Sequence, residues 1–210
     1  MMEITASMVK ELRDRSGAPM MDCKTALVES KGDLETAHKI LRQKGQATAA
    51  KRSTKATSEG AVGSYIHGGG RIGVLVEVNC ETDFVARTAD FQALVKDLAM
   101  HIAASEPRFV DREQVTSKVL DEEREIYRQQ ARATGKPEPV VEKIVTGKME
   151  KFYQEFCLME QPFVRDPNVS VRDLIGSIIA KCGENIRVKR FARYVLGQDE
   201  AGKASGPTAR

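Results

Sequence analysis

The sequence predicts an α+β protein: a small three-helix bundle, a linker, and an α+β core whose three-stranded antiparallel sheet is packed by helices. Three observations lead to this fold class. Apolar residues recur at helical spacing in residues 1–45, alternate with a period of two in residues 60–79, and return to helical spacing from residue 88 onward. A chain of 210 residues also has room for one medium domain and one small one, because domains commonly hold roughly 100–200 residues.

The bundle is expected in residues 1–45. Its first helix closes at Gly17, because glycine readily takes the left-handed conformation that ends a helix. The second helix starts at Pro19, whose missing N–H costs nothing at that position. Asp33 is a good N-cap for the third helix, and Gly45 suits its closing position. A module this short buries little apolar surface, which indicates a docking unit.

A linker is expected in residues 46–59, which hold Lys51, Arg52 and Lys55 among Ala, Ser and Thr but no large apolar residue. Two interpretations are open, a solvated linker or a basic arm that binds RNA. The net charge of +3 favours the solvated linker, because a dedicated nucleic-acid binder carries a larger surplus of Lys and Arg.

The core is expected in residues 60–196. Its first hairpin turns at Gly68-Gly69-Gly70, and the strand that follows the turn places its valines on one face. Thr88 then caps a helix with an unbroken apolar stripe, which we expect at the centre of the core. The stripe comprises Phe91, Leu94, Val95, Leu98 and Ile102.

Three more helices are expected in the core. Two charged helices at residues 117–133 and 138–156 are separated by a Gly-Lys-Pro break and should pack as an antiparallel pair. Ser170 and Asp173 form a capping-box-like start for the last helix, which ends at Gly183.

The last strand is expected at residues 186–196. Its basic residues lie on both faces, which suits an edge strand that must avoid aggregation. Residues 197–210 are rich in Gly, Ala, Ser and Pro and are predicted to form a disordered tail.

Motifs for catalysis and nucleotide binding are missing or out of context. Residues 68–73 match the spacing G-x-G-x-x-G, but they precede a strand instead of opening a helix, and no P-loop motif occurs. His38, His67 and His101 are isolated from one another, and no serine lies in a G-x-S-x-G motif. A hydrolase that uses His67 or His101 stays a remote alternative. We therefore expect no enzymatic activity and no cofactor.

The four cysteines, Cys23, Cys80, Cys157 and Cys182, form no C-x-x-C pair, so we expect no metal site and mostly buried, reduced thiols. Cys80 stands beside Glu81, and a carboxylate neighbour raises the pKa of a thiol. The amino terminus lacks a basic stretch followed by an apolar one, and no run reaches the roughly 18 apolar residues of a membrane span. A cytoplasmic protein is expected, with a protein partner, no direct nucleic-acid contact and no membrane.

Two segments have two interpretations each. In Thr82-Asp83-Phe84-Val85, either Phe84 fills the core beneath a capped turn, or the preceding strand presents Phe84 and Asp83 on a loop as a binding site. Met20-Met21 opens a short helix, where core packing is the usual role. Adjacent helix positions point about 100° apart, so one of the two can be exposed as a contact for another protein.

Two stretches resemble the elongation factor Ts family. Residues 12–27 read Leu-Arg-Asp-Arg-Ser-Gly-Ala-Pro-Met-Met-Asp-Cys-Lys-Thr-Ala-Leu and depart from the family pattern at Ser16, Pro19 and Thr25. Residues 77–87 read Glu-Val-Asn-Cys-Glu-Thr-Asp-Phe-Val-Ala-Arg and match it without an evident departure. The resemblance extends over residues 3–196. It implies an amino-terminal ubiquitin-associated-like helical module, a linker, and an α+β core of the short, single-core type.

The resemblance also implies a function, guanine-nucleotide exchange on the GTPase elongation factor Tu. In this family the segment Thr82–Val85 approaches the nucleotide domain of the GTPase, where Phe84 wedges between helices and disturbs the Mg²⁺ and phosphate site, and Asp83 orients the contact. Short members of the family pair as homodimers through their sheets, for which an exposed sheet face gives a physical reason. The module would grip the nucleotide domain through Arg13, Met20 and Met21, with Lys24 a weaker candidate.

Overall fold

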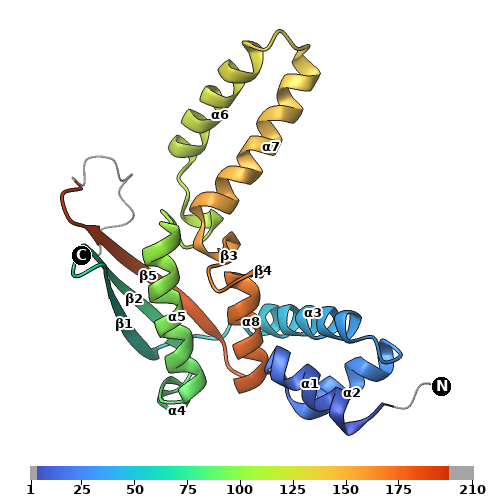
Figure 1. The fold of residues 1–210 in the computed structure, drawn as a ribbon. Coiled ribbons are helices and arrows are strands. Elements are labelled where there is room, and N and C mark those ends of the chain that lie inside the picture. The colour runs from blue at the N-terminus through green and yellow to red at the C-terminus, as the bar shows by residue number, and fades with distance from the viewer. Residues whose placement is uncertain (1–3, 199–210) are drawn as a thin grey trace. The chain divides into compact units, whose positions relative to one another are not determined.

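The computed structural model describes residues 4–198. Helices and a three-stranded sheet form the expected α+β fold (Figure 1). The chain divides into two compact units. The first consists of residues up to Gly63, Val76–Leu98 and Arg172–Lys189. The second consists of Ser64–Leu75, Ala99–Val171 and the residues from Arg190 onward. The tail predicted at 197–210 lies almost entirely outside the described residues.

The three helices of the amino-terminal bundle are α1 (Ala6–Ser16), α2 (Met20–Glu29) and α3 (Leu34–Arg52). Gly17 ends α1 with a φ of 66°, and the Asp33 side chain accepts a hydrogen bond from the Thr36 amide at the start of α3. The end of α1 and the start of α3 confirm the predicted ones. The bundle encloses a small apolar core of its own, which includes Leu12, Cys23, Ala26, Leu27 and Ala37.

The predicted end of the third helix is wrong. Gly45 does not close α3, which continues to Arg52, so residues 46–52 of the expected linker are helical and only residues 53–58 connect it to the sheet. The reason is tertiary: Gly45 is buried against Gly176, and a Cβ at position 45 would lie 3.4 Å from the Gly176 carbonyl oxygen. This packing outweighs the roughly 1 kcal/mol by which glycine is less favourable than alanine inside a helix.

The sheet has the strand order β1-β2-β5, with β1 at Glu59–His67, β2 at Ile72–Cys80 and β5 at Ile186–Val195. This order confirms the last strand as an edge strand. Gly68, Gly69 and Gly70 all have positive φ and make the turn between β1 and β2. The valines of β2 are buried as predicted, namely Val74, Val76 and Val78.

Helices α4 (Asp83–Ala86), α5 (Ala89–Ser105) and α8 (Val171–Cys182) complete this part of the fold. Thr88 accepts a hydrogen bond from the Phe91 amide at the start of α5, and all five residues of the predicted apolar stripe are buried. Gly183 ends α8 in the left-handed conformation, also as predicted.

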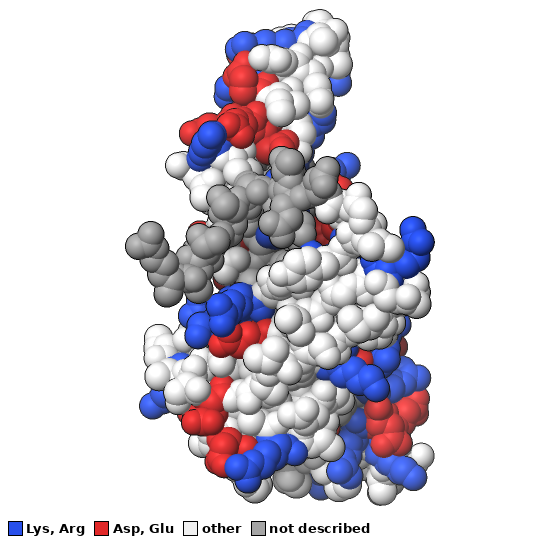
Figure 2. Space-filling view, turned by 90° about the vertical axis from the view of Figure 1, so that its left-hand side faces the viewer, with Lys and Arg blue, Asp and Glu red and all other residues white. Residues whose placement is uncertain are grey.

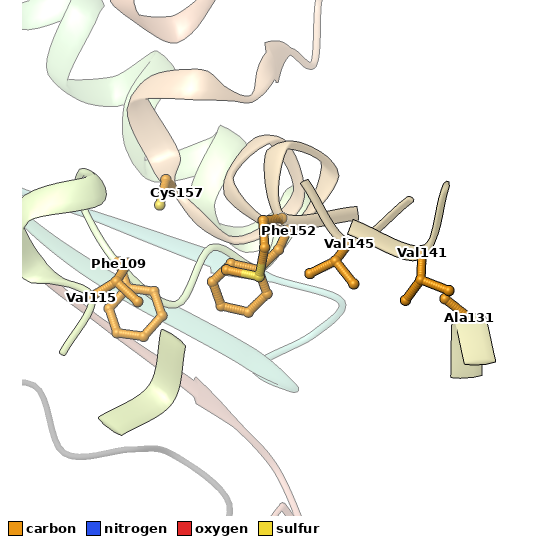
Figure 3. Packing of buried hydrophobic residues seen from close by; sticks show 8 residues of the cluster. Phe109, Val115, Ala131, Val141, Val145, Phe152 and Cys157 are labelled. Atoms are coloured by element: carbon orange, nitrogen blue, oxygen red, sulfur yellow. The ribbon is translucent and has the colours of Figure 1, made fainter. Parts of the chain in front are cut away.

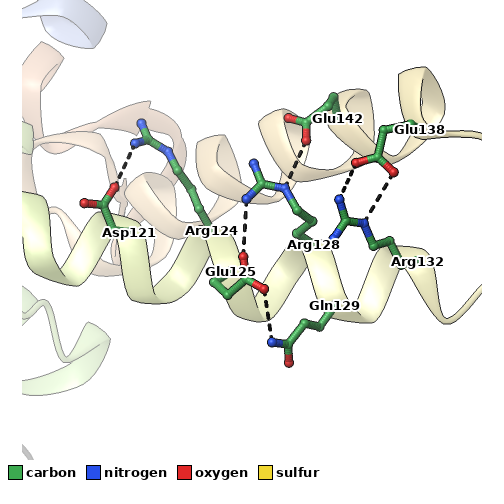
Figure 4. A network of polar contacts seen from close by, with 8 residues as sticks. All are labelled: Asp121, Arg124, Glu125, Arg128, Gln129, Arg132, Glu138 and Glu142. Carbon is green, nitrogen blue, oxygen red and sulfur yellow. Dashed lines mark hydrogen bonds and ion pairs between the residues drawn. The ribbon is translucent and has the colours of Figure 1, made fainter.

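Helices α6 (Ser117–Arg132) and α7 (Glu138–Phe156) form the predicted antiparallel hairpin. Figure 3 shows the apolar side chains between and beneath them, with Phe152 near the middle of the cluster. On the outside, Arg128 pairs with Glu125 and Glu142, and Arg132 pairs with Glu138 (Figure 4). Exposed pairs of this kind contribute little each, but together they favour one register of the two helices.

Four small elements near this hairpin were not predicted. Strands β3 (Pro162–Phe163) and β4 (Asp166–Ser170) pair antiparallel, after the 3-10 turn η2 (Leu158–Glu160); a similar turn, η1, covers Arg112–Gln114. His101 is buried beside β3, where its Nδ1 accepts a hydrogen bond from the Val164 amide and its Nε2 lies 2.9 Å from Gln161 Oε1. Burial lowers the pKa of His101, so the neutral ring is favoured.

Candidate functional site

The segment Thr82–Val85 lies directly after strand β2, whose valines are buried. The Thr82 side chain accepts a hydrogen bond from the Val85 amide and thereby caps α4, which is a single helical turn. Extended backbone at Thr82 changes abruptly to helix at Asp83, so the side chains of this turn leave the direction of the strand.

Phe84 is 76% exposed at the tip of this turn, whereas Val85 is only 4% exposed. The interpretation in which Phe84 fills the core is therefore wrong. Most of this apolar ring lies outside the core and is accessible to another molecule. Asp83 is also exposed and pairs with Arg87 at 2.7 Å.

The side chain of Val85 is not an exposed contact. It is buried together with Ala86, because a one-turn helix that exposes Phe84 must turn its next residues inward. Within the predicted segment, the side chain of Val85 therefore anchors the turn from below.

Glu184, 102 positions later in the sequence, holds this segment through Thr82. Its carboxylate accepts hydrogen bonds from the Thr82 amide at 3.0 Å and from the Thr82 hydroxyl at 2.7 Å. The next residue, Asn185, donates its amide N–H to Glu81 at 2.6 Å. Sequence reasoning missed both residues. The only local signal was a pair of polar residues between Gly183 and an apolar strand, which is ordinary for a loop.

Cys80, at the end of β2, is buried and its thiol donates to the Thr82 carbonyl oxygen at 3.1 Å. Burial, helped by the carboxylate of Glu184, raises the pKa of Cys80 to about 11. The predicted direction is confirmed, but the carboxylates that add to the effect of burial are those of Glu184 and Glu59, not Glu81. A thiol with this pKa stays protonated at neutral pH and is a poor nucleophile.

The second candidate surface lies on the amino-terminal bundle. Met20 and Met21 are the first two residues of α2, and they are 53% and 70% exposed. Arg13 on α1 and Lys24 on α2 are exposed as well. We expected one exposed methionine, and the structure exposes both, since the core of so small a bundle is already filled by smaller side chains.

Neither surface carries a cluster of metal-binding side chains in the part of the chain that the structure describes. Within residues 4–198, no three His, Cys, Asp or Glu side chains come together as a metal site. None of the helices in this range is long and apolar enough to cross a bilayer. What the two surfaces expose is an aromatic ring with an acidic neighbour and a pair of methionines.

The profile of a protein family described as "Elongation factor TS" matches residues 2–198. Proteins named "Elongation factor Ts" are similar over most of the chain. The one from Koribacter versatilis (strain Ellin345) is 57% identical over 219 residues, which cover 100% of both proteins. Those from Geobacter sulfurreducens and Desulforamulus reducens are each 59% identical, covering 94% of this chain and 91% of their own length.

Proposed function

The chain belongs to the elongation factor Ts family, and from this premise we propose that it is a guanine-nucleotide exchange factor for elongation factor Tu that releases GDP by disturbing the Mg²⁺ and phosphate site of the GTPase. The observation that carries the finer part of this proposal is the exposure of Phe84 at the end of a rigid strand. As a translation factor, the protein would act in the cytoplasm.

Phe84 acts in this proposal as a wedge. The ring is presented by a one-turn helix whose base is held by Thr82, Glu184 and the buried Val85. Since this base is already ordered, little conformational entropy is lost when the ring enters a gap between helices of the partner. Asp83 borders the ring and orients the contact.

Binding antagonism is sufficient for the mechanism. If the factor and Mg²⁺–GDP prefer different conformations of the GTPase, each weakens the binding of the other by the same factor. Burying one Phe contributes about 1.5–3 kcal/mol, and each tenfold weakening takes about 1.4 kcal/mol. Burial of Phe84 alone can thus weaken the binding of Mg²⁺–GDP by about ten- to a hundredfold. The remaining contact energy must come from elsewhere on the protein.

Arg13, Met20, Met21 and Lys24 are the proposed source of part of that energy. The two methionines present flexible, polarizable side chains that adapt to an apolar surface of the partner, and the two cations are exposed on the same bundle. This part of the molecule anchors the GTPase without touching its nucleotide.

The direct test is stopped-flow release of a fluorescent GDP analogue from elongation factor Tu, with and without this protein. We expect strong acceleration that saturates as the factor concentration rises. If release is not accelerated, the proposed function is wrong. If binding occurs without acceleration and survives Phe84→Ala but not replacement of Met20 and Met21 by Ala, the protein is instead an adaptor.

We further propose a homodimer that forms through the outer face of the sheet. Ile66 and Leu75 are exposed, and a Cβ at Gly73 would lie 3.4 Å from Ile66 Cδ1, so Ile66, Gly73 and Leu75 share one face. On β5, Arg193 turns to the Ala103 carbonyl oxygen of α5, which leaves exposed Tyr194 pointing away from that helix. Figure 2, which views the molecule from the side of the sheet, shows a broad area without charged side chains.

Sedimentation velocity tests the dimer. The wild-type protein should sediment as a dimer, and Leu75→Glu should shift it toward monomer, because a buried unpaired charge is costly. Ile126→Glu, at an exposed position of α6, is the matched control and should leave the dimer intact. A wild-type monomer at all accessible concentrations would exclude this assembly.

A further inference from the structure

Helix α3 meets α8 at a point where two glycines face each other. Gly45 of α3 faces Gly176 of α8: a Cβ at Gly45 would be 3.4 Å from the Gly176 carbonyl oxygen, and a Cβ at Gly176 would be 3.8 Å from the Gly45 carbonyl carbon. Without side chains at these two positions the helix backbones approach directly. The amino-terminal bundle is therefore packed onto the core through α3, within one compact unit.

A buried carboxylate fixes the orientation of this crossing. The Asp173 side chain, on α8, is only 3% exposed and accepts hydrogen bonds from Gln46 Nε2 at 2.5 Å and from Arg42 at 3.0 Å, both on α3. A carboxylate in such a place is stable only while its partners stay in position. Rotation or sliding of α3 would remove those partners, so the pairing specifies one arrangement of the two helices.

The carboxyl-terminal end of α3 is tied to the segment that carries Phe84. Arg52 lies 3.5 Å from Glu81, and Asn185 donates its side-chain amide to the Lys55 carbonyl oxygen at 2.8 Å. Asn185 also donates its backbone N–H to Glu81, and its neighbour Glu184 holds Thr82. A continuous set of contacts thus leads from α3 to the base of the exposed ring.

We propose that α3 is a rigid spacer that holds the Met20–Met21 pair and Phe84 in one fixed geometry, so that both engage the GTPase together. The positioning residues are Arg42, Asp173 and Gly176, which act through the contact between α3 and α8. This inference rests on the proposed exchange function. When the geometry is fixed, binding of the methionine pair places Phe84 at a high effective concentration near its own site on the GTPase. A loosely attached bundle would lower that effective concentration. The extension of α3 beyond Gly45, which the bundle itself does not need, is explained by this role.

The test compares release of a fluorescent GDP analogue from elongation factor Tu over a range of factor concentrations for two matched pairs of variants. Gly176→Leu should force α3 from α8, whereas Gly176→Ala adds only a Cβ at ordinary contact distance. Arg42→Glu should repel Asp173, whereas Arg42→Lys keeps the charge; the Arg42 side chain is partly exposed and Gln46 still donates to Asp173, so either variant should fold. Circular dichroism confirms folding of each variant.

We expect Gly176→Leu and Arg42→Glu to lower the release rate at saturating factor by roughly three- to tenfold, and Gly176→Ala and Arg42→Lys to leave it near wild type. A purely structural defect would differ, because a partly unfolded sample needs more protein to saturate but reaches the same rate. Folded Arg42→Glu with an unchanged saturating rate would overturn the spacer, even if Gly176→Leu does not fold. If the wild-type protein itself gives no acceleration, the exchange function fails first, and that result is distinguishable from the failure of the spacer alone.

Discussion

Replacement of Phe84 by Ala separates function from folding more cleanly than any other single change in this protein. The ring is 76% exposed, so its removal should change the free energy of unfolding by no more than about 0.5 kcal/mol. If the same ring becomes buried in the partner, its loss removes about 1.5–3 kcal/mol of contact energy. We therefore expect the GDP release rate at saturating factor to fall by roughly ten- to a hundredfold.

The assay is stopped-flow release of a fluorescent GDP analogue at several factor concentrations. Because Met20 and Met21 are retained, Phe84→Ala should still associate with the GTPase, and the loss should appear in the saturating rate more than in the half-saturating concentration. Ile126→Ala is the control, since Ile126 is also an exposed apolar residue but lies on the α6–α7 hairpin. An unchanged saturating rate for Phe84→Ala, with normal folding, would refute the wedge.

Three further predictions concern the surroundings of this site and the stability of the core. Glu184→Ala removes the acceptor of two hydrogen bonds from the exposed Thr82, so we expect a loss of no more than about 1 kcal/mol in urea denaturation but a several-fold slower saturating release, with Glu184→Gln in between. Burial holds the pKa of His101 below its ordinary 6.5, so as the pH falls the unfolded chain binds a proton at this residue before the folded protein does. The contribution of His101 to the free energy of unfolding should therefore be complete above about pH 6.5 and decrease as the pH drops below it. In denaturation at a series of pH values, His101→Gln should reduce that dependence on pH. The pKa of Cys80 is about 11 and that of Cys157 about 12, so both should react with an aromatic disulfide reagent far more slowly in the folded protein than in denaturant; equal rates would contradict their burial.

Much of the fold follows from local sequence. Asp33, Thr88 and Gly183 act at helix ends through bonds or backbone angles that involve residues no more than four positions away. The apolar stripe of α5 and the valines of β2 follow the same logic, because a helix or strand repeats its buried positions at a fixed period. The segment Thr82–Val85 and its resemblance to a known family could likewise be identified from local sequence, because consecutive residues carry the motif.

Only the tertiary structure decided which side of that segment meets water. Composition favoured a buried Phe84, and the one-turn helix that buries Val85 exposes the ring instead. The partners that hold this arrangement are distant in sequence: Glu184 binds Thr82 across 102 positions, and Asp173 binds Gln46 across 127. Gly45, whose local role would be to end a helix, lies inside one because Gly176 approaches it. Local patterns specify a helix, its caps and its apolar face, but the free energy of such long-range contacts exists only once the chain has brought those residues together.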